Sequence, residues 1–390
     1  MILSGYSVVE LATHIAGPGA AGIIADWGAE VIKVETPGGD PLRRVKPGPN
    51  GLGPMFEHEN RGKRSVVLDY RKPEALGALR ELIGRADVFI TSVRPDSLAR
   101  AGLDWASLQA VYPRLIYASV TGYGLEGPIT ARAAFDNTGF WARSGLAYAN
   151  WPEGVDPFRF RSGMGDHHCA IATALGIVTA LLDRTRTGRG RLVETSLLKS
   201  GVHAGAGDMA DHLRLGVFAP TPLRGSPGAP LSNYFLTADR RWICLLPLDP
   251  VRSWPEIFSA AGRPELAADE RFSTAEGRSA NVRALEAALD EGFGAMSYAE
   301  AAERLEQTNL VWSLVQTPAE TAEDPAAIAA GCFTRTDDGE GGTFRAPAAP
   351  VRFSGEEDQV KGPVPALGEH TDAVLAEIGY SPADIARLKS

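Results

Sequence analysis

An aspartate and two histidines follow a glycine-spaced turn in residues 161–177, RSGMGDHHCAIATALGI. An aspartate carboxylate can attack an activated acyl group, whereas histidines can transfer protons or bind a metal ion. Asp166 also precedes an apolar run and is a residue type that caps helices, where its carboxylate accepts hydrogen bonds from free backbone N–H groups. The stretch by itself therefore leaves catalysis and helix capping open for Asp166.

The histidines and cysteines predict no metal site. Side chains of adjacent residues such as His167 and His168 project about 100° apart on a helix and rarely bind one ion together. The chain has three cysteines, at positions 169, 244 and 332. Their odd number and wide spacing match neither a zinc site nor a disulfide framework, so we expect free thiols.

A second motif, near the N-terminus, resembles a dinucleotide-binding loop. GxGxxG is matched by three glycines, Gly17, Gly19 and Gly22. Glu35 follows at about the distance of a ribose-binding acid, which raises the alternative of an NAD- or FAD-dependent oxidoreductase. However, residues 11–16 separate the strand from the first glycine, and Pro18 removes a backbone N–H that a phosphate cradle would use. The motif is therefore a weak indication.

Composition is that of a globular protein with more than one core. The chain has 390 residues, 44% of them hydrophobic, and a net charge of −9. This charge argues against a nucleic-acid-binding surface. The longest uncharged apolar stretch, residues 169–182, is shorter than the roughly 18–20 residues of a membrane span, and no basic segment precedes the first apolar residues. We expect a cytoplasmic protein that uses no membrane.

Two local clusters are nonetheless strongly basic, residues 60–64 (NRGKR) and 184–191 (RTRTGRGR). Concentrated positive charge suits a polyphosphorylated small molecule, and it is also common in solvated loops. The sequence leaves both interpretations open.

The first part of the chain alternates between strand-like and helix-like segments. SVVEL, AEVIKVE, SVVLDY, DVFITS and RLIYASV read as strands with helical stretches between most of them. This rhythm predicts an α/β fold with a doubly wound, mostly parallel, Rossmann-like sheet. A proline- and glycine-rich stretch after Val217 marks a domain boundary. We predict a large domain over 1–217, a smaller α+β domain over 218–325, and a C-terminal segment, 326–390, that returns to the large domain.

Five segments together resemble one family. They are THIAGPGAAGIIADWGAEVIKVETPGGDPLR, NRGKRSVVLDYRKPE, RPDSLARAGLDWASLQAVYPRLIYASVTGYG, SGMGDHHCAIATALGIVTALLDRTRTGRGRLVETSLL and PALGEHTDAVLAEIGYS. In this order they resemble the family III CoA-transferases, the CaiB/BaiF type, which include formyl-CoA, carnitine and bile-acid CoA-transferases. The resemblance implies transfer of CoA from an acyl-CoA to a small carboxylic acid, with coenzyme A as a substrate and no tightly bound cofactor.

The resemblance makes Asp166 the nucleophile. Its carboxylate would attack the acyl-CoA thioester to give a mixed anhydride, and the released thiolate would return to form an aspartyl-CoA thioester, which the acceptor acid then resolves. We expect the N-terminal end of a helix to keep Asp166 ionised.

Further residues are assigned by the same resemblance. Arg94 corresponds to an arginine that lies against the CoA adenine, and Arg132 lies near a phosphate contact. The nucleotide end of CoA would be lined by Lys33, Glu35, Asn60, Arg61 and Lys63. A substrate pocket would include His14, Ile15, Asp136 and His167. The aromatic residues Phe135 and Trp141 could shape its apolar wall, or they could simply belong to the core. Ile15 stands where oxalate-specific relatives have a glutamine, so oxalate is not expected.

Two other functions stay open. The fold relatives that racemise α-methylacyl-CoA esters pair the aspartate with a histidine, where this chain has Phe135, although His167 or His168 could replace that base. A non-catalytic CoA-binding protein would need Arg94 but not a carboxylate at position 166. Either way, the resemblance implies a homodimer of interlocked, ring-like subunits.

Overall fold

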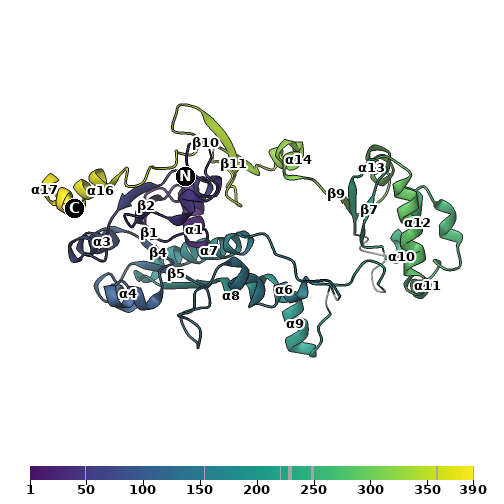
Figure 1. Ribbon diagram of the computed structural model, residues 1–390, viewed down its shortest axis with the longest axis horizontal. Helices are drawn as coiled ribbons and strands as arrows, with labels where there is room; N and C mark the ends of the chain where they lie inside the picture. The colour runs from purple at the N-terminus through teal and green to yellow at the C-terminus, as the bar shows by residue number, and fades with distance from the viewer. Residues whose placement is uncertain are drawn as a thin grey trace. The chain divides into compact units, whose positions relative to one another are not determined.

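The computed structural model describes residues 1–48, 50–152, 154–219, 221–226, 231–246, 250–356 and 359–389. The chain forms two compact units (Figure 1). The first contains residues 1–150, 156–218 and 326–390, and the second contains residues 151–155 and 219–325. Apart from residues 151–155, the second unit is thus one insertion between two parts of the first.

A six-stranded parallel sheet forms the centre of the first unit. Its strands are β1 (Ser7–Leu11), β2 (Glu30–Glu35), β3 (Arg64–Val67), β4 (Val88–Thr91), β5 (Ile116–Thr121) and β6 (Leu192–Ser196). Their spatial order is β3-β2-β1-β4-β5-β6, and each neighbouring pair is parallel. This is the strand order of the Rossmann fold, so the predicted doubly wound sheet is confirmed.

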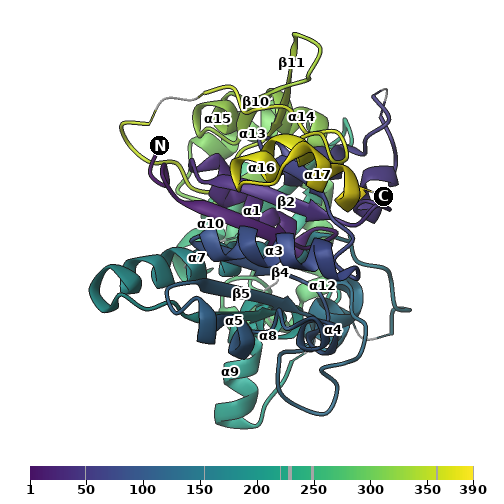
Figure 2. The ribbon, with the colours of Figure 1, turned by 90° about the vertical axis from the view of Figure 1, so that its left-hand side faces the viewer.

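Both faces of the sheet are buried, because successive strand residues alternate between two cores. Val9 and Phe89 point into one core, whereas Val8 and Ile90 point into the other. The first face is covered by α3 (Pro73–Arg85), α4 (Pro95–Ala101), α5 (Trp105–Val111), α16 (Thr371–Glu377) and α17 (Pro382–Lys389). Helices α1 (Ala16–Asp26) and α7 (Met164–Thr187) cover the second face and pack against each other (Figure 2).

The other elements of the first unit connect or flank this sandwich. They are η1 (Pro41–Arg44), α2 (Pro54–Asn60), the π-helical η2 (Asn137–Ala142), α6 (Leu146–Ala149), α8 (Leu197–Ala204), α9 (Ala206–Leu215), α15 (Pro325–Ala329), β10 (Phe333–Asp337) and β11 (Thr343–Pro347). Helices α8 and α9 follow each other directly and separate at Gly205. Strands β10 and β11 form an antiparallel pair.

The second unit has its own core. Strands β7 (Asn233–Leu236), β8 (Trp242–Leu245) and β9 (Trp312–Leu314) form an antiparallel sheet. Its helices are α10 (Pro250–Ala260), η3 (Pro264–Ala268), α11 (Ala275–Ala280), α12 (Val282–Gly294), α13 (Tyr298–Glu306) and α14 (Pro318–Glu323). Phe235, Phe258 and Phe293 are fully buried among them. Residues 220, 227–230 and 247–249 of the predicted small domain lie outside the described part of the chain.

The GxGxxG glycines lie inside helix α1 rather than in a loop. A Cβ atom on Gly19 would lie 2.7 Å from Oε2 of Glu59, and one on Gly22 would lie 2.8 Å from the Glu59 backbone oxygen. The missing side chains therefore let α2 approach α1 closely. Because the motif serves helix packing and forms no turn between strand and helix, the structure argues against the NAD or FAD alternative.

Because of this packing, we predict that alanine substitutions at two helical glycines change the stability of the protein in opposite directions. Gly22→Ala should lower the free energy of unfolding by about 1–3 kcal/mol, because the new methyl group meets backbone that cannot rotate away. Gly77→Ala, at an exposed position of helix α3 with nothing within 4 Å of the new Cβ, should raise stability by about 0.5–1 kcal/mol. Denaturant titrations of both variants test the pair; equal effects would contradict the assignment of Gly22 to close packing.

Candidate active site

Helix α7 begins in a turn that its two glycines permit. Gly163 precedes the helix with φ of 97°, a left-handed conformation that favours glycine. A Cβ atom on Gly165 would lie 2.1 Å from Cγ of Phe140. The spacing Gly-Met-Gly-Asp therefore fixes a sharp entry into α7, with Asp166 in the first turn of the helix.

Asp136, and not Asp166, caps this helix. The backbone N–H groups of Gly163 and Gly165 donate to the two carboxylate oxygens of Asp136 at 2.8 and 2.9 Å. Asp136 is 3% exposed and lies directly before η2. The capping role that the sequence allowed for Asp166 thus belongs to a carboxylate 30 positions earlier in the chain. The Asp166 carboxylate stays available for another role.

The Asp166 carboxyl is far less acidic than an ordinary aspartate. Burial, followed by the neighbouring charge of Asp136, raises its pKa to about 7, while His167 acts in the opposite direction. This corrects the expectation that the helix N-terminus keeps Asp166 fully ionised. A carboxylate with a raised pKa binds protons more strongly and, once ionised, is also a better nucleophile.

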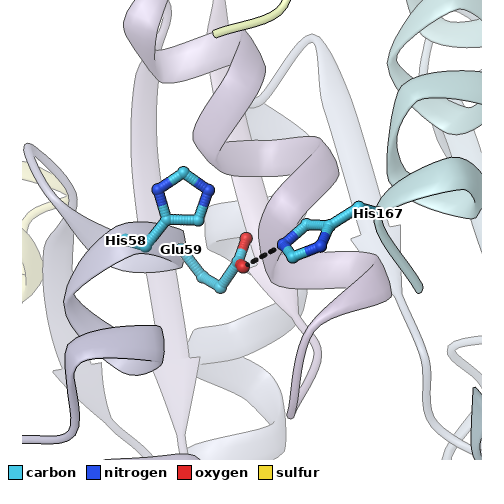
Figure 3. Close-up of side chains that lie close together, drawn as sticks. All are labelled: His58, Glu59 and His167. Atoms are coloured by element: carbon cyan, nitrogen blue, oxygen red, sulfur yellow. Dashed lines mark hydrogen bonds and ion pairs between the residues drawn. The ribbon is translucent and has the colours of Figure 1, made fainter. Parts of the chain in front are cut away.

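His167 is bound to a buried acid of helix α2. Its Nε2 lies 2.8 Å from Oε1 of Glu59, which is 2% exposed (Figure 3). Its ring centroid lies 5.7 Å from that of His58. The hydrogen bond with Glu59 raises the pKa of His167. Sequence reasoning missed Glu59, because nothing in a chain separation of 108 residues indicates this contact.

A pocket of about 530 Å³ opens between α1, α2, α7 and residues 347–350. His58, Glu59, Arg61, Asp26 and His167 form its polar wall. The rest is mostly apolar and is lined by Gly19, Gly22, Ile23, Pro54, Met55, Ala170, Ile171, Pro347, Ala348, Ala349 and Pro350. A Cβ atom on Gly163 would contact side-chain atoms of Ile15, His167 and Met55. Two residues of the pocket wall, His167 and Met55, therefore lie close to the turn that carries Asp166.

The same polar wall contains the one group of possible metal ligands in the described part of the chain. Donor atoms of His58, Glu59 and His167 lie within 4.8 Å of one another. However, Nη1 of Arg61 lies 3.0 Å from Nδ1 of His58, and Arg61 also pairs with Asp26. A permanently charged guanidinium at this position opposes a second cation. Hydrogen bonding between the side chains therefore explains the group without a metal.

Residues predicted to line the nucleotide end of CoA are largely buried. Both Lys33 and Lys63 are fully enclosed and pair with Glu10 at 2.7 and 2.6 Å. Lys33 also pairs with Asp40, whose carboxylate accepts from the His14 backbone N–H. The other three predicted residues of this set are engaged within the chain as well. Glu35 binds Arg43, Asn60 binds the Phe56 carbonyl, and Arg61 binds Asp26.

These contacts correct the picture of an exposed basic cluster at residues 60–64. Asn60, Arg61 and Lys63 are each at most 4% exposed, so they do not form a solvated loop. Arg61 and Lys63 instead link the end of helix α2 to helix α1, through the Asp26 carboxylate and the Pro18 carbonyl. They stabilise the site from within.

Other predicted residues lie at the carboxyl end of the parallel strands, where ligands of such sheets bind. Arg94 is exposed and precedes α4, and Arg132 is exposed in the segment after β5. The rings of His14, after β1, and Phe135 meet edge to face at 5.2 Å. Trp141 packs beside Phe140 and stacks on Phe160 at 4.1 Å. The structure thus brings His14, Phe135 and the Asp136–Asp166 turn to one edge but assigns Trp141 to an aromatic cluster.

A family model described as CoA-transferase family III matches residues 3–371. The chain belongs to this family. The resemblance inferred from the five segments is confirmed, and the protein is an enzyme, a family III acyl-CoA:carboxylate CoA-transferase.

Relatives match the whole length of this CoA-transferase. The (R)-2-hydroxy-4-methylpentanoate CoA-transferase of Clostridioides difficile is 30% identical over 394 residues, which cover 100% of this chain and 98% of the relative. The cinnamoyl-CoA:phenyllactate CoA-transferase of Clostridium sporogenes is 30% identical over 403 residues, covering 100% and 96%. A crystal structure of a CaiB/BaiF family protein from Brucella suis matches with a TM-score of 0.85 at 30% identity, covering 96% of this chain and 99% of that one.

The raised pKa of Asp166 makes a prediction about the stability of this CoA-transferase. An ordinary aspartate has a pKa near 4, so between about pH 4 and 7 the folded protein retains a proton that the unfolded chain has lost. Stability therefore falls as the pH rises through this window. Asp166→Asn removes the effect and should stabilise the protein by about 1–3 kcal/mol at pH 8, and by little at pH 4.

Denaturant titrations at the two pH values measure this difference. Asp136→Ala is the matched control, because it removes the helix cap and should destabilise the protein by about 1–2 kcal/mol. A destabilising effect of Asp166→Asn at pH 8 would show that Asp166 also has a structural role.

Proposed function

We propose that Asp166 is the nucleophile that carries the acyl group and then CoA during transfer. In the first step its carboxylate oxygen forms a bond to the thioester carbon, the C–S bond breaks, and the CoA thiolate leaves with the electron pair. The products are a mixed anhydride and free thiolate. The thiolate then attacks the Asp166 carbonyl and releases the donor acid. The acceptor carboxylate and the aspartyl-CoA thioester repeat these two steps in the reverse sense.

One observation carries this proposal. Asp166 is a half-buried carboxylate whose helix is capped by another residue and whose pKa lies near 7. Among the described residues, no hydrogen bond engages its side chain. A carboxylate in this state costs stability, and such groups concentrate at catalytic positions.

For the substrates, we propose CoA thioesters and carboxylic acids with an apolar side chain. The pocket beside the Asp166 turn has mostly apolar walls, among them Ile23, Met55 and Ile171. Two relatives are named for (R)-2-hydroxy-4-methylpentanoate and phenyllactate, acids whose side chains are hydrocarbon. Ile15, which lies against Gly163, offers no hydrogen bond to a second carboxylate, so oxalate remains an unexpected substrate.

For CoA itself, we propose contacts with the exposed arginines at the carboxyl edge of the sheet. Arg94 would stack on the adenine and Arg132 would meet a phosphate. No ion pair engages either side chain in the described part of the chain, so both guanidinium groups are free to bind an anionic ligand.

We also propose a cytoplasmic homodimer of interlocked subunits. Leu175 and Leu182 on α7 are each 66% exposed and lie on one face of the helix. Leu213 and Leu215 of α9 are also exposed, at 78% and 66%. By length and composition α7 could cross a membrane, but 44% of its most apolar window is buried inside the protein. A second copy of the chain, rather than lipid, would cover these apolar faces.

The racemase alternative is less well supported. The residue at the position of the second base is Phe135, whose ring cannot carry a proton. His167 is held by its Nε2 to Glu59, which leaves this nitrogen unavailable as a base.

Covalent trapping tests the nucleophile. With an acyl-CoA and hydroxylamine or borohydride, wild-type protein should be modified at Asp166, as mass spectrometry of peptides can show. Asp166→Ala should bind CoA nearly normally and lose acyl exchange by at least about a thousandfold, because the two-step route is then closed. Asp183→Ala, on the exposed part of the same helix, is the matched control and should keep full activity.

Two results would contradict this mechanism. One is an Asp166→Ala variant that keeps a substantial part of the exchange activity without any trapped adduct. The other is rapid deuterium incorporation at the α-carbon of a 2-methylacyl-CoA in the absence of acceptor acid, which would restore the racemase.

Assembly is tested by light scattering in detergent-free buffer. At micromolar concentration the protein should have twice the mass of the 41.4 kDa chain. Leu175→Glu should prevent assembly or leave the protein insoluble, because it places a charge on the apolar face of α7. If the rings interlock, dilution of the wild type should produce no monomer short of unfolding. A monodisperse wild-type monomer would refute the proposal.

A further inference from the structure

Glu59 is enclosed where three helices meet. Its carboxylate lies above Gly19 of α1, whose missing Cβ leaves the space that Oε2 occupies. It points from α2 toward α7, where His167 meets Oε1 (Figure 3). Within the described ranges, His167 is the one side chain that hydrogen-bonds to Glu59. The contact is thus built by α1, α2 and α7 together.

Such a contact favours a charged imidazole. A carboxylate at 2% exposure is costly to bury alone, and one opposite charge at hydrogen-bond distance offsets much of this cost. An imidazole becomes that partner by gaining one proton near neutral pH. Glu59, together with the charges of Asp166 and Asp136, raises the pKa of His167 in agreement with this geometry.

Among the described residues, no other group around His167 supplies the positive charge that acts on Asp166. His58 lies next to His167, and burial lowers its pKa, so it stays neutral. Arg61 is engaged with Asp26 and His58. Residues 347–350, on the far wall of the pocket, carry no charge. In the described part of the chain, His167 is therefore the cation whose charge acts on Asp166.

We propose that Glu59 holds His167 as an imidazolium beside Asp166, and that this cation keeps the nucleophile ionised while an anionic acceptor approaches. The idea rests on the proposed role of Asp166. His167 keeps its proton throughout and forms no bond to the substrate, so it is a positioning residue. A positive charge is required at this site for an electrostatic reason. Transfer between two acids brings the acceptor's carboxylate to a site that already contains the carboxylates of Asp136 and Asp166.

The pH profile of turnover gives the first test. His167→Asn removes the charge and can retain a hydrogen bond to Glu59. The acidic limb of kcat/KM should move up by about one pH unit, so that activity is about fivefold lower at pH 7 and recovers near pH 9. His168→Asn, at the exposed neighbouring position, should leave the profile unchanged. An unshifted profile in His167→Asn would overturn the proposal.

Histidine NMR gives a second test that needs no turnover. With the seven histidines isotope-labelled, His167 of the wild type should titrate above its ordinary midpoint of about 6.5. The midpoint should fall by about one unit in Glu59→Gln, and also in Asp166→Asn, because coupling between two sites is reciprocal. The wild-type measurement remains decisive even if a variant fails to fold.

The outcomes separate the two proposals. The proposed Glu59–His167 ion pair is overturned if the titration midpoint of wild-type His167 is at or below 6.5, or if Glu59→Gln leaves this midpoint unchanged. Either result holds whatever the activity of the Asp166 variants. Conversely, a full exchange rate in Asp166→Ala overturns the nucleophile even if His167 titrates as expected.

Discussion

The hydrogen bonds from the start of α7 to Asp136 are the interaction on which the site depends. A helix begins with N–H groups that have no partner in the helix, and an aspartate near them normally satisfies its own helix. Here the cap comes from the segment after β5. The nucleophile candidate is thereby freed from capping, yet the cap's negative charge and the surrounding apolar atoms make its ionised form costly. One interaction thus fixes the geometry and sets the acidity.

The remaining buried charges are arranged to support this turn. Glu10, Lys33, Lys63 and Asp40 form a closed network beneath the loops that follow β1 and β2. Asp40 holds the backbone of His14, which keeps a φ of 66° and places its ring against Phe135. Removing one member of such a network leaves the other charges buried without compensation. The loops beside the candidate site therefore rest on charged side chains that are paired inside the protein.

The sheet could be predicted from the sequence, because strand and helix periods are local properties and their alternation has few solutions. The Asp166 motif could also be found, since glycine types and spacing are visible in the chain. The roles of Lys33 and Lys63 could not. NRGKRS has the composition of a solvated loop, and only the folded chain shows that Glu10 lies opposite both lysines. The role of Glu59 could not be predicted for a related reason. Its environment is created by Gly19 and His167, which are both distant from it in sequence.

The order of the chain has a consequence for synthesis on the ribosome. Val374, Leu375 and Ile385 of α16 and α17 belong to the same core as Leu79 and Phe89. Helices α16 and α17 are translated after the whole of the second unit, residues 151–155 and 219–325, which has a core of its own. The second unit can therefore fold during translation. The first unit cannot complete its core until α16 and α17 have been translated, and one face of its sheet stays incompletely covered until then. Until α16 and α17 have been translated, this face is a hydrophobic surface on which chaperones can bind.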